Sequence, residues 1–115
     1  MLSPMARNIG VLAVLAVVAY SSAASAQYQC PSEIGGRRLQ GLSVFEGDPA
    51  KQVDLAPAGL QAKVGYINVW DLRSYRGLIA VCRYDGGQSN QSVLPQGVKQ
   101  CRVDSTPRRT VAVCE

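Results

Sequence analysis

Between Val64 and Tyr84, apolar and polar residues alternate in the way that is typical of β-strands. Before a polar turn at 73–77, one face carries Val64, Tyr66, Asn68, Trp70 and Leu72. After the turn, one face carries Leu78, Ala80, Cys82 and Tyr84. A period of two with many β-branched and aromatic side chains favours strands over a helix. The pattern therefore predicts a hairpin at the centre of the fold, and this hairpin contains the single tryptophan of the chain.

A further strand is predicted at 37–46, on the N-terminal side of this hairpin. Its alternating residues are Leu42 and Val44 on one face, and Ser43 and Phe45 on the other. The sequence Gly-Asp-Pro at 47–49 ends the strand, because proline lacks an amide donor and restricts the residue before it. Residues 50–60 fit either one helical turn or a short edge strand, and we leave both open.

The residue pattern in the C-terminal half predicts three more short strands, at 88–94, 99–105 and 110–115. The first of them is polar and is expected at a sheet edge. Turn residues separate the strands at regular intervals, which is typical of an antiparallel β domain. We therefore expect a mainly β protein: a small antiparallel sheet or sandwich of six to seven short strands.

Residues 1–26 have the three regions of a secretory signal peptide. Arg7 supplies the basic region, an apolar run follows it, and Ala-Ser-Ala supplies the cleavage motif. The apolar run is shorter than the roughly 20 residues of a membrane-spanning helix, although an uncleaved anchor is the alternative. We expect cleavage between Ala26 and Gln27, which leaves 27–115 as a single disulfide-bonded domain in the periplasm or outside the cell.

The predicted mature domain carries eleven of the twelve basic residues and all eight acidic ones, for a formal net charge of +3. A domain this small has a modest core and often needs covalent cross-links. All four cysteines of the chain fall within it: Cys30, Cys82, Cys101 and Cys114. An even number in a small exported domain indicates two disulfides. A metal site is the alternative, but the chain lacks histidine and any Cys-x-x-Cys pair.

One of three possible connectivities is favoured. If 101–104 and 111–114 pair as a hairpin, Cys101 lies opposite Cys114, at a distance suited to a disulfide. That pairing leaves Cys30 to bond with Cys82.

Five short motifs occur in order along this domain. They are Cys30-Pro31, Phe45-Glu46-Gly47-Asp48-Pro49, Trp70-Asp71-Leu72, Cys82-Arg83-Tyr84, and Leu-Pro-Gln-Gly at 94–97 with Cys101 four residues later. In these motifs the chain resembles an uncharacterised family of small exported proteins of Gram-negative bacteria. The resemblance covers nearly all of the predicted mature chain and implies export. It implies no activity, and no functional residue follows from it.

Catalysis has little support in the sequence. Without histidine, Ser-His-Asp and Cys-His arrangements are excluded, and paired cysteines are not nucleophiles. The carboxylates of Glu46, Asp48 and Asp54 could in principle act as a hydrolytic pair, but turns are rich in acidic residues for structural reasons. We therefore expect a protein that is not an enzyme and that uses no cofactor and no metal.

The predicted turn at 73–77 carries the residues most suited to a binding role. Arg73, Tyr75 and Arg76 occupy a turn where packing gives no reason for them, and Arg and Tyr are enriched among interface residues that dominate affinity. A net charge of +3 in an exported protein argues against nucleic acid as the partner. We expect these three residues to contact another exported or envelope protein, with Glu46 and Asp48 as the next candidates.

Three classes of function remain. The first is a non-catalytic protein-binding module of the inhibitor or immunity type. A small cross-linked β domain suits this role, because a rigid surface loses little entropy on binding. The second is a structural or assembly component of the envelope. The third is a carboxylate-dependent hydrolase that acts on cell-wall material. No membrane contact is expected after cleavage of the signal peptide.

Overall fold

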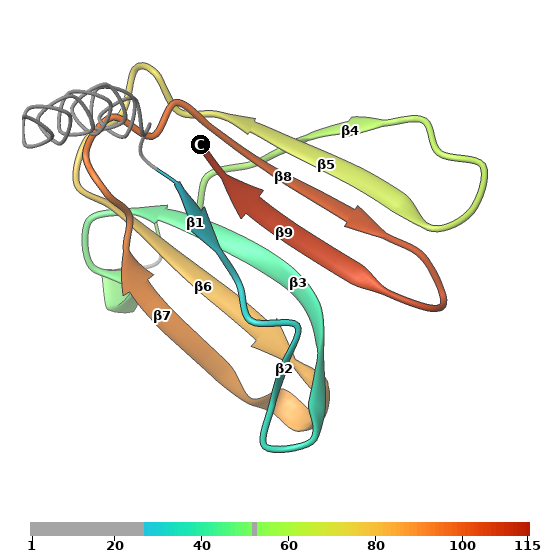
Figure 1. Ribbon diagram of the computed structural model, residues 1–115. Helices are drawn as coiled ribbons and strands as arrows, with labels where there is room; N and C mark the ends of the chain where they lie inside the picture. Colours follow the sequence, from blue (N-terminus) through green and yellow to red (C-terminus); the bar gives the residue numbers. More distant parts are fainter. Residues whose placement is uncertain (1–26, 52) are drawn as a thin grey trace, which may run out of the picture.

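The structure is a computed structural model that describes residues 27–51 and 53–115. The predicted signal peptide lies outside these residues. The described part forms two antiparallel sheets (Figure 1). The five-stranded sheet has the order β1 (Tyr28–Gln29), β9 (Thr110–Cys114), β8 (Gln100–Ser105), β5 (Tyr66–Asp71) and β4 (Ala58–Leu60). The four-stranded sheet has the order β2 (Glu33–Ile34), β3 (Arg37–Glu46), β6 (Leu78–Tyr84) and β7 (Ser89–Val93). The mainly β antiparallel fold expected from the sequence is confirmed.

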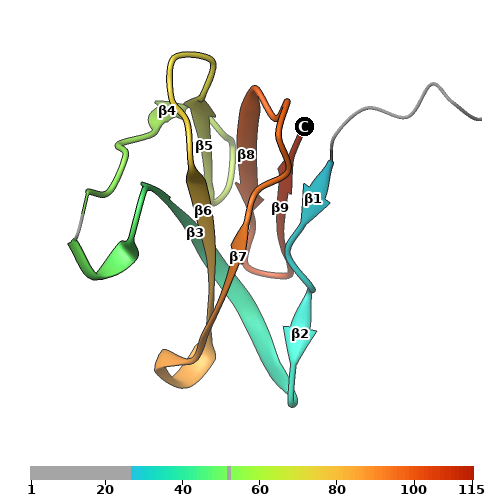
Figure 2. The same cartoon turned by 90° about the vertical axis from the view of Figure 1, so that its left-hand side faces the viewer.

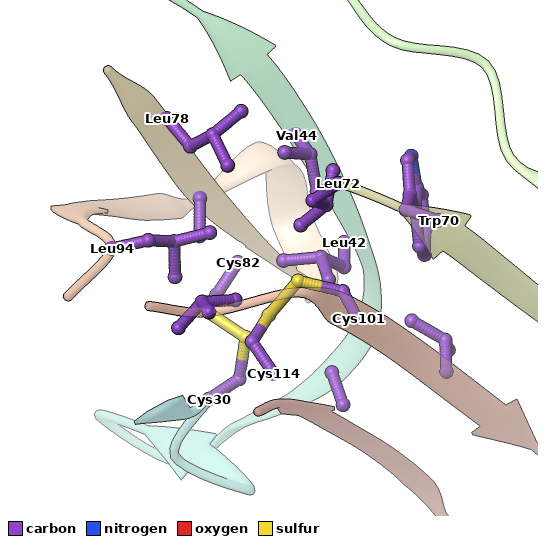
Figure 3. Close-up of a cluster of buried hydrophobic side chains, with 14 of the residues drawn as sticks. Cys30, Leu42, Val44, Trp70, Leu72, Leu78, Cys82, Leu94, Cys101 and Cys114 are labelled. Carbon is purple, nitrogen blue, oxygen red and sulfur yellow. A yellow bond between two sulfur atoms is a disulfide. The ribbon is translucent and has the colours of Figure 1, made fainter. Parts of the chain in front are cut away.

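The predicted alternation of side chains is confirmed in β3 and β6. Leu42 and Val44 of β3 are buried, whereas Ser43 and Phe45 on the opposite face are half-buried. In β6 the buried residues are Leu78, Ala80, Cys82 and Tyr84. Both strands therefore direct one face into a core that the five-stranded sheet completes from the other side with Trp70, Val103, Ala112 and both of its cysteines (Figure 3).

The predicted central hairpin is wrong. β5 and β6 are both strands, as expected, but they belong to different sheets and do not pair with each other. β5 pairs with β4 and β8, and β6 pairs with β3 and β7, so both edges of each strand are already occupied. The segment 73–77 is consequently not a hairpin turn but the connection between the two sheets.

Both disulfides form with the expected connectivity. Cys101 and Cys114 are direct partners in the β8–β9 register and are bonded within the five-stranded sheet. Cys30, which follows β1, is bonded to Cys82 of the four-stranded sheet and so links the two layers. The two bonds lie close together in the core (Figure 3), and all four cysteines are at most 2% exposed.

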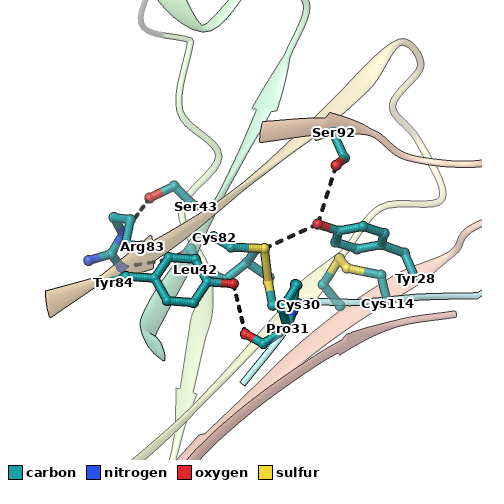
Figure 4. The surroundings of a disulfide bond; sticks show 11 residues. Tyr28, Cys30, Pro31, Leu42, Ser43, Cys82, Arg83, Tyr84, Ser92 and Cys114 are labelled. Atoms are coloured by element: carbon teal, nitrogen blue, oxygen red, sulfur yellow. Dashed lines mark hydrogen bonds between the residues drawn. A yellow bond between two sulfur atoms is a disulfide. The ribbon is translucent and has the colours of Figure 1, made fainter. Parts of the chain in front are cut away.

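The N-terminal segment passes from one sheet to the other along one side of the molecule, where β1 is followed by β2 (Figure 2). Hydrogen bonds anchor it beside the Cys30–Cys82 bond (Figure 4). The Tyr84 hydroxyl donates to the Pro31 carbonyl oxygen at 2.7 Å. The Tyr28 hydroxyl lies 3.2 Å from the Cys82 sulfur and donates to the Ser92 hydroxyl oxygen at 3.4 Å. The segment is therefore held by a covalent bond and by side-chain hydrogen bonds at the same place.

Both alternatives for residues 50–60 occur. A 3-10 turn covers Pro49–Lys51, and β4 forms a short edge strand. Between them the chain lies along β3, through a bridge between Phe45 and Asp54. The indole nitrogen of Trp70 donates to the Leu55 carbonyl oxygen at 2.9 Å, so the tryptophan holds this connection against the core.

Candidate functional site

The 73–77 loop, which comprises Arg73, Ser74, Tyr75, Arg76 and Gly77, crosses from β5 to β6 at one end of the molecule. All five residues are exposed, and Tyr75 keeps 40% of its surface accessible. The flanking residues Leu72 and Leu78 are buried and fix the loop at both ends. The Leu72 amide also donates to the Lys99 carbonyl oxygen at 2.8 Å. The loop thus presents exposed side chains from an anchored backbone.

The three predicted contact residues do not have equal freedom. Arg73 is paired with Asp71 at 2.6 Å between Nη2 and Oδ2, and its Nε and backbone amide both donate to Oδ1 of the same carboxylate. Hydrogen bonds from the Arg73 side chain and then its backbone lower the pKa of Asp71 to about 2. Arg73 is therefore held beside the end of β5 in an exposed ion pair, which leaves Tyr75 and Arg76 as the better candidates for partner contact.

The structure brings the 73–77 loop next to the acidic turn at 46–48. The β3–β6 ladder continues beyond the strands, since the Gly47 amide donates to the Gly77 carbonyl oxygen at 2.9 Å. One carboxylate oxygen of Glu46 accepts the Arg76 amide at 3.3 Å. The first and second candidate surfaces, which lie some thirty residues apart in the sequence, therefore form one surface at the same end of the molecule.

A groove of about 420 Å³ opens beside the loop. Its walls come from the loop and from the end of β7, and the lining residues are Tyr75, Arg76, Gly77, Leu78, Val93, Leu94, Pro95 and Gln96. Val93 is 74% exposed, more than any other large hydrophobic residue described. This groove was not predicted, because the β6–β7 pairing that brings its two walls together is a long-range contact.

Glu46 and Asp48, the acidic residues of the turn at 46–48, both accept hydrogen bonds from backbone amides. Asp48 accepts the Ala50 amide at 2.9 Å and so stabilises the 3-10 turn at Pro49–Lys51. Glu46 accepts a backbone amide of the neighbouring loop. Within 27–51 and 53–115, no cluster of three or more histidine, cysteine or acidic side chains is arranged to hold a metal ion. The 73–77 loop and the acidic turn together present a contact surface at this end of the molecule.

A second feature, at the opposite end of β3, was missed by sequence reasoning. Arg38 lines a cleft of about 370 Å³ together with Arg108 and Arg109 of the β8–β9 turn. The one acidic residue in its lining is Glu33. The Arg-Arg pair looks like an ordinary solvated turn in the sequence, and only the fold places it next to β3. The cleft gives this end of the molecule a positive charge.

The described residues thus form a disulfide-bonded, two-sheet β protein with an anchored loop of exposed Tyr and Arg. The chain belongs to the type VI secretion system Tli immunity protein family, whose sequence pattern it matches over residues 31–115. The match covers every described strand except β1 and supports the resemblance to a family of small proteins. No curated protein and no solved structure matches the chain. Among the described residues, no helix is long and apolar enough to cross a membrane.

Proposed function

We propose that this protein is a periplasmic immunity protein that binds a type VI secretion effector and neutralises it by occupying its surface. The observation that carries the proposal is membership of the Tli immunity protein family over most of the chain. Immunity of this kind needs a partner-binding surface and no chemistry of its own. The 73–77 loop, with Tyr75 and Arg76 at its exposed tip, is the surface best suited to the first contact.

The loop is suited to tight binding because its backbone is held before the partner arrives. Buried leucines fix both ends, the Gly47–Gly77 hydrogen bond joins it to β3, and Asp71 orients Arg73. A surface that is already ordered pays little conformational entropy on association. Exposed Tyr and Arg side chains at such a position can each contribute more than average to affinity.

We expect the double substitution Tyr75→Ala/Arg76→Ala to weaken binding of the effector by about 2 kcal/mol or more, with little effect on folding. Affinity is measured by calorimetry against each type VI effector encoded in the source genome, produced as a purified protein. Stability is measured by urea unfolding. Because both side chains are exposed, the variant should unfold at nearly the wild-type urea concentration.

The matched control is Lys63→Ala/Val64→Ala, which also removes one exposed cation and one exposed hydrophobic side chain. These residues precede β5 and therefore lie at the other end of that strand. The control should bind as wild type does. Undiminished binding by Tyr75→Ala/Arg76→Ala would place the contact surface elsewhere, and equal loss in both variants would show that the effect is not specific to the loop. Failure of wild type to bind any of the effectors would contradict the proposed function itself.

Export is the second part of the proposal, and it rests on the signal-peptide pattern of residues 1–26. We expect the protein recovered from the periplasm to begin at Gln27. Intact mass determination of the purified protein tests the cleavage site directly. A periplasmic protein that retains Met1 would contradict cleavage, and a protein found only in the cytoplasm would contradict export.

A further inference from the structure

β7 is the longest of the four strands at the sheet edges in the described structure. It has five residues, whereas the edge strands β1 and β2 have two each and β4 has three. β7 pairs with β6 on one side, and no described strand pairs with its other side. Figure 1 shows it at the outer margin of the four-stranded sheet.

The β6–β7 register defines which backbone groups of β7 are free. The Leu94 amide donates to Leu78, and the Tyr84 amide donates to Gln88, so the residues of even number between them bond to β6. In an antiparallel pair the intervening residues direct their N–H and C=O groups away from the partner strand. The backbone groups of Ser89, Gln91 and Val93 are therefore available to another strand.

Nothing in the sequence of β7 protects this edge. Natural sheets commonly block an open edge with lysine, proline, a bulge or a very short strand. From Gln88 to Leu94 there is no charged residue and no proline, and the pairing with β6 is regular over all five residues. A strand of this kind is suited to pairing with an extended segment of another protein.

The side chains beside this edge indicate what such a segment carries. Val93 is 74% exposed and continues a cross-strand row with Ile79 and Phe45 on the outer face of the four-stranded sheet. The groove between Val93 and Tyr75 has about 420 Å³, which is enough for a large apolar side chain. An apolar residue of the partner would fill it.

Charge gives the second element of specificity. Two ion pairs are present among the described residues, Arg73–Asp71 and Arg102–Asp104. Arg76, in the wall of the groove, belongs to neither. Arg83, on the outer face next to Ser89 in the register, donates to the Ser43 hydroxyl and the Leu42 carbonyl oxygen, which leaves its charge without a carboxylate (Figure 4). The surface along β7 therefore favours an acidic partner segment.

We propose that the effector adds a β-strand to the free edge of β7, with an apolar side chain in the groove beside Val93 and a carboxylate beside Arg76. This inference rests on the proposed function, because it takes the effector as the partner. It goes further in naming the mode of binding and the chemistry of the bound segment. The bound effector segment becomes the fifth strand of the four-stranded sheet.

Hydrogen exchange of the wild-type protein tests the backbone contacts without any substitution. The amides of Ser89, Gln91 and Val93 should exchange rapidly in the free protein, because they face solvent. Upon binding of the effector that calorimetry identifies, their exchange should slow by at least about tenfold, as for other sheet amides. Unchanged exchange at all three amides in a saturated complex would overturn the proposal.

The substitution Gln91→Pro removes an amide hydrogen that faces away from β6, so the internal ladder keeps its hydrogen bonds. We expect it to weaken effector binding by about tenfold or more, whereas the matched control Gln91→Ala, which keeps the amide, should bind nearly as wild type does. Melting temperature shows whether the proline variant is folded. If it is not folded, the hydrogen-exchange result decides.

Val93→Asp tests the groove, with Val64→Asp as its control at another exposed valine. The first should lower affinity by at least about tenfold, and the second should leave it unchanged. If wild type binds an effector but Gln91→Pro and Val93→Asp bind it equally well, the strand-addition proposal fails while the proposed function stands. If no effector binds, both fail. A wild-type dimer that Gln91→Pro dissociates would show that the edge binds a second copy instead.

Discussion

Tyr84 of β6 holds the N-terminal segment against the four-stranded sheet through its side-chain hydroxyl. It is 3% exposed, and its hydroxyl donates to the Pro31 carbonyl oxygen next to the Cys30–Cys82 bond (Figure 4). Burial, with a smaller contribution from Tyr28, raises the pKa of Tyr84 above its ordinary value. Because the Tyr84 hydroxyl holds its proton more tightly in the folded protein than in the unfolded chain, the free energy of unfolding depends on pH in the alkaline range.

The sign of this dependence follows from the direction of the shift. The unfolded chain ionises its tyrosines near pH 10, whereas folded Tyr84 stays protonated to a higher pH, so the contribution is complete below pH 10 and is lost as the pH rises further. We expect Tyr84→Phe to lose about 1 kcal/mol of stability at pH 7, because the Pro31 carbonyl loses its donor. The variant should also show a weaker decline in stability between pH 9 and 11 than wild type.

Urea unfolding at a series of pH values measures both effects. Tyr75→Phe is the control, since it removes a hydroxyl from an exposed ring and should leave stability at pH 7 unchanged. An equal alkaline decline in wild type and Tyr84→Phe would contradict the assigned role of Tyr84.

At the scale of single residues, the sequence predicted which side chains are buried but not which side chains pair with one another. Leu42, Val44 and Cys82 are buried as their alternation requires, because burial depends on which face of a strand a residue occupies. The partner of Arg73, Asp71, was not anticipated, since it depends on how the chain leaves β5. The meeting of Glu46 with Arg76 likewise depends on strand pairing and not on local pattern.

At the scale of elements, every strand of five or more residues was anticipated near its true place, but one pairing was wrong. Alternation shows that β5 and β6 each bury one face. The same alternation is expected whether the two strands pair as a hairpin or face each other across a core, so it does not distinguish these arrangements. The five-residue connection is also compatible with both. What separates them is long-range pairing: Trp70 lies opposite Cys101, and Cys82 lies opposite Leu42. No local signal in 64–84 encodes those partners.

The disulfides were predicted correctly because four cysteines allow only three pairings, and a bond requires its two cysteines to lie close together. The β8–β9 hairpin alone places Cys101 opposite Cys114, and the remaining pair follows. The two bonds differ in the length of chain they enclose, with sequence separations of 52 for Cys30–Cys82 and 13 for Cys101–Cys114. They should therefore contribute differently to stability.

We expect removal of Cys30–Cys82 by double alanine substitution to cost about 4 kcal/mol and removal of Cys101–Cys114 to cost about 3 kcal/mol, because the longer loop restricts the unfolded chain more. All four sulfurs belong to buried residues, so the packing loss is similar in the two variants and each serves as the control for the other. Chemical unfolding of the two purified variants gives the comparison. A larger cost for the shorter loop would contradict the chain-entropy argument and point to strain or packing instead.

At the scale of the whole molecule, the two ends differ in charge. One end carries the 73–77 loop together with the acidic turn at 46–48. The other carries the cleft lined by Arg38, Arg108 and Arg109. The predicted mature domain has a net charge of +3, from eleven basic and eight acidic residues, so a partner with an acidic surface is attracted before contact. The basic cleft would therefore affect mainly the association rate, whereas the 73–77 loop would affect mainly the dissociation rate, and kinetic measurements distinguish the two.

The double substitution Arg108→Gln/Arg109→Gln should slow association with the effector by about threefold at low salt and leave dissociation unchanged. Screening acts over about 10 Å at 0.1 M salt, so the difference from wild type should shrink as salt is added. Tyr75→Ala/Arg76→Ala should do the opposite and mainly accelerate dissociation, because it removes side chains from the contact itself. Surface plasmon resonance over a salt series measures both rates. If instead the Arg108/Arg109 variant dissociates faster while the Tyr75/Arg76 variant does not, the effector binds in the basic cleft, and the contact surface lies at the opposite end of β3 from the one proposed here.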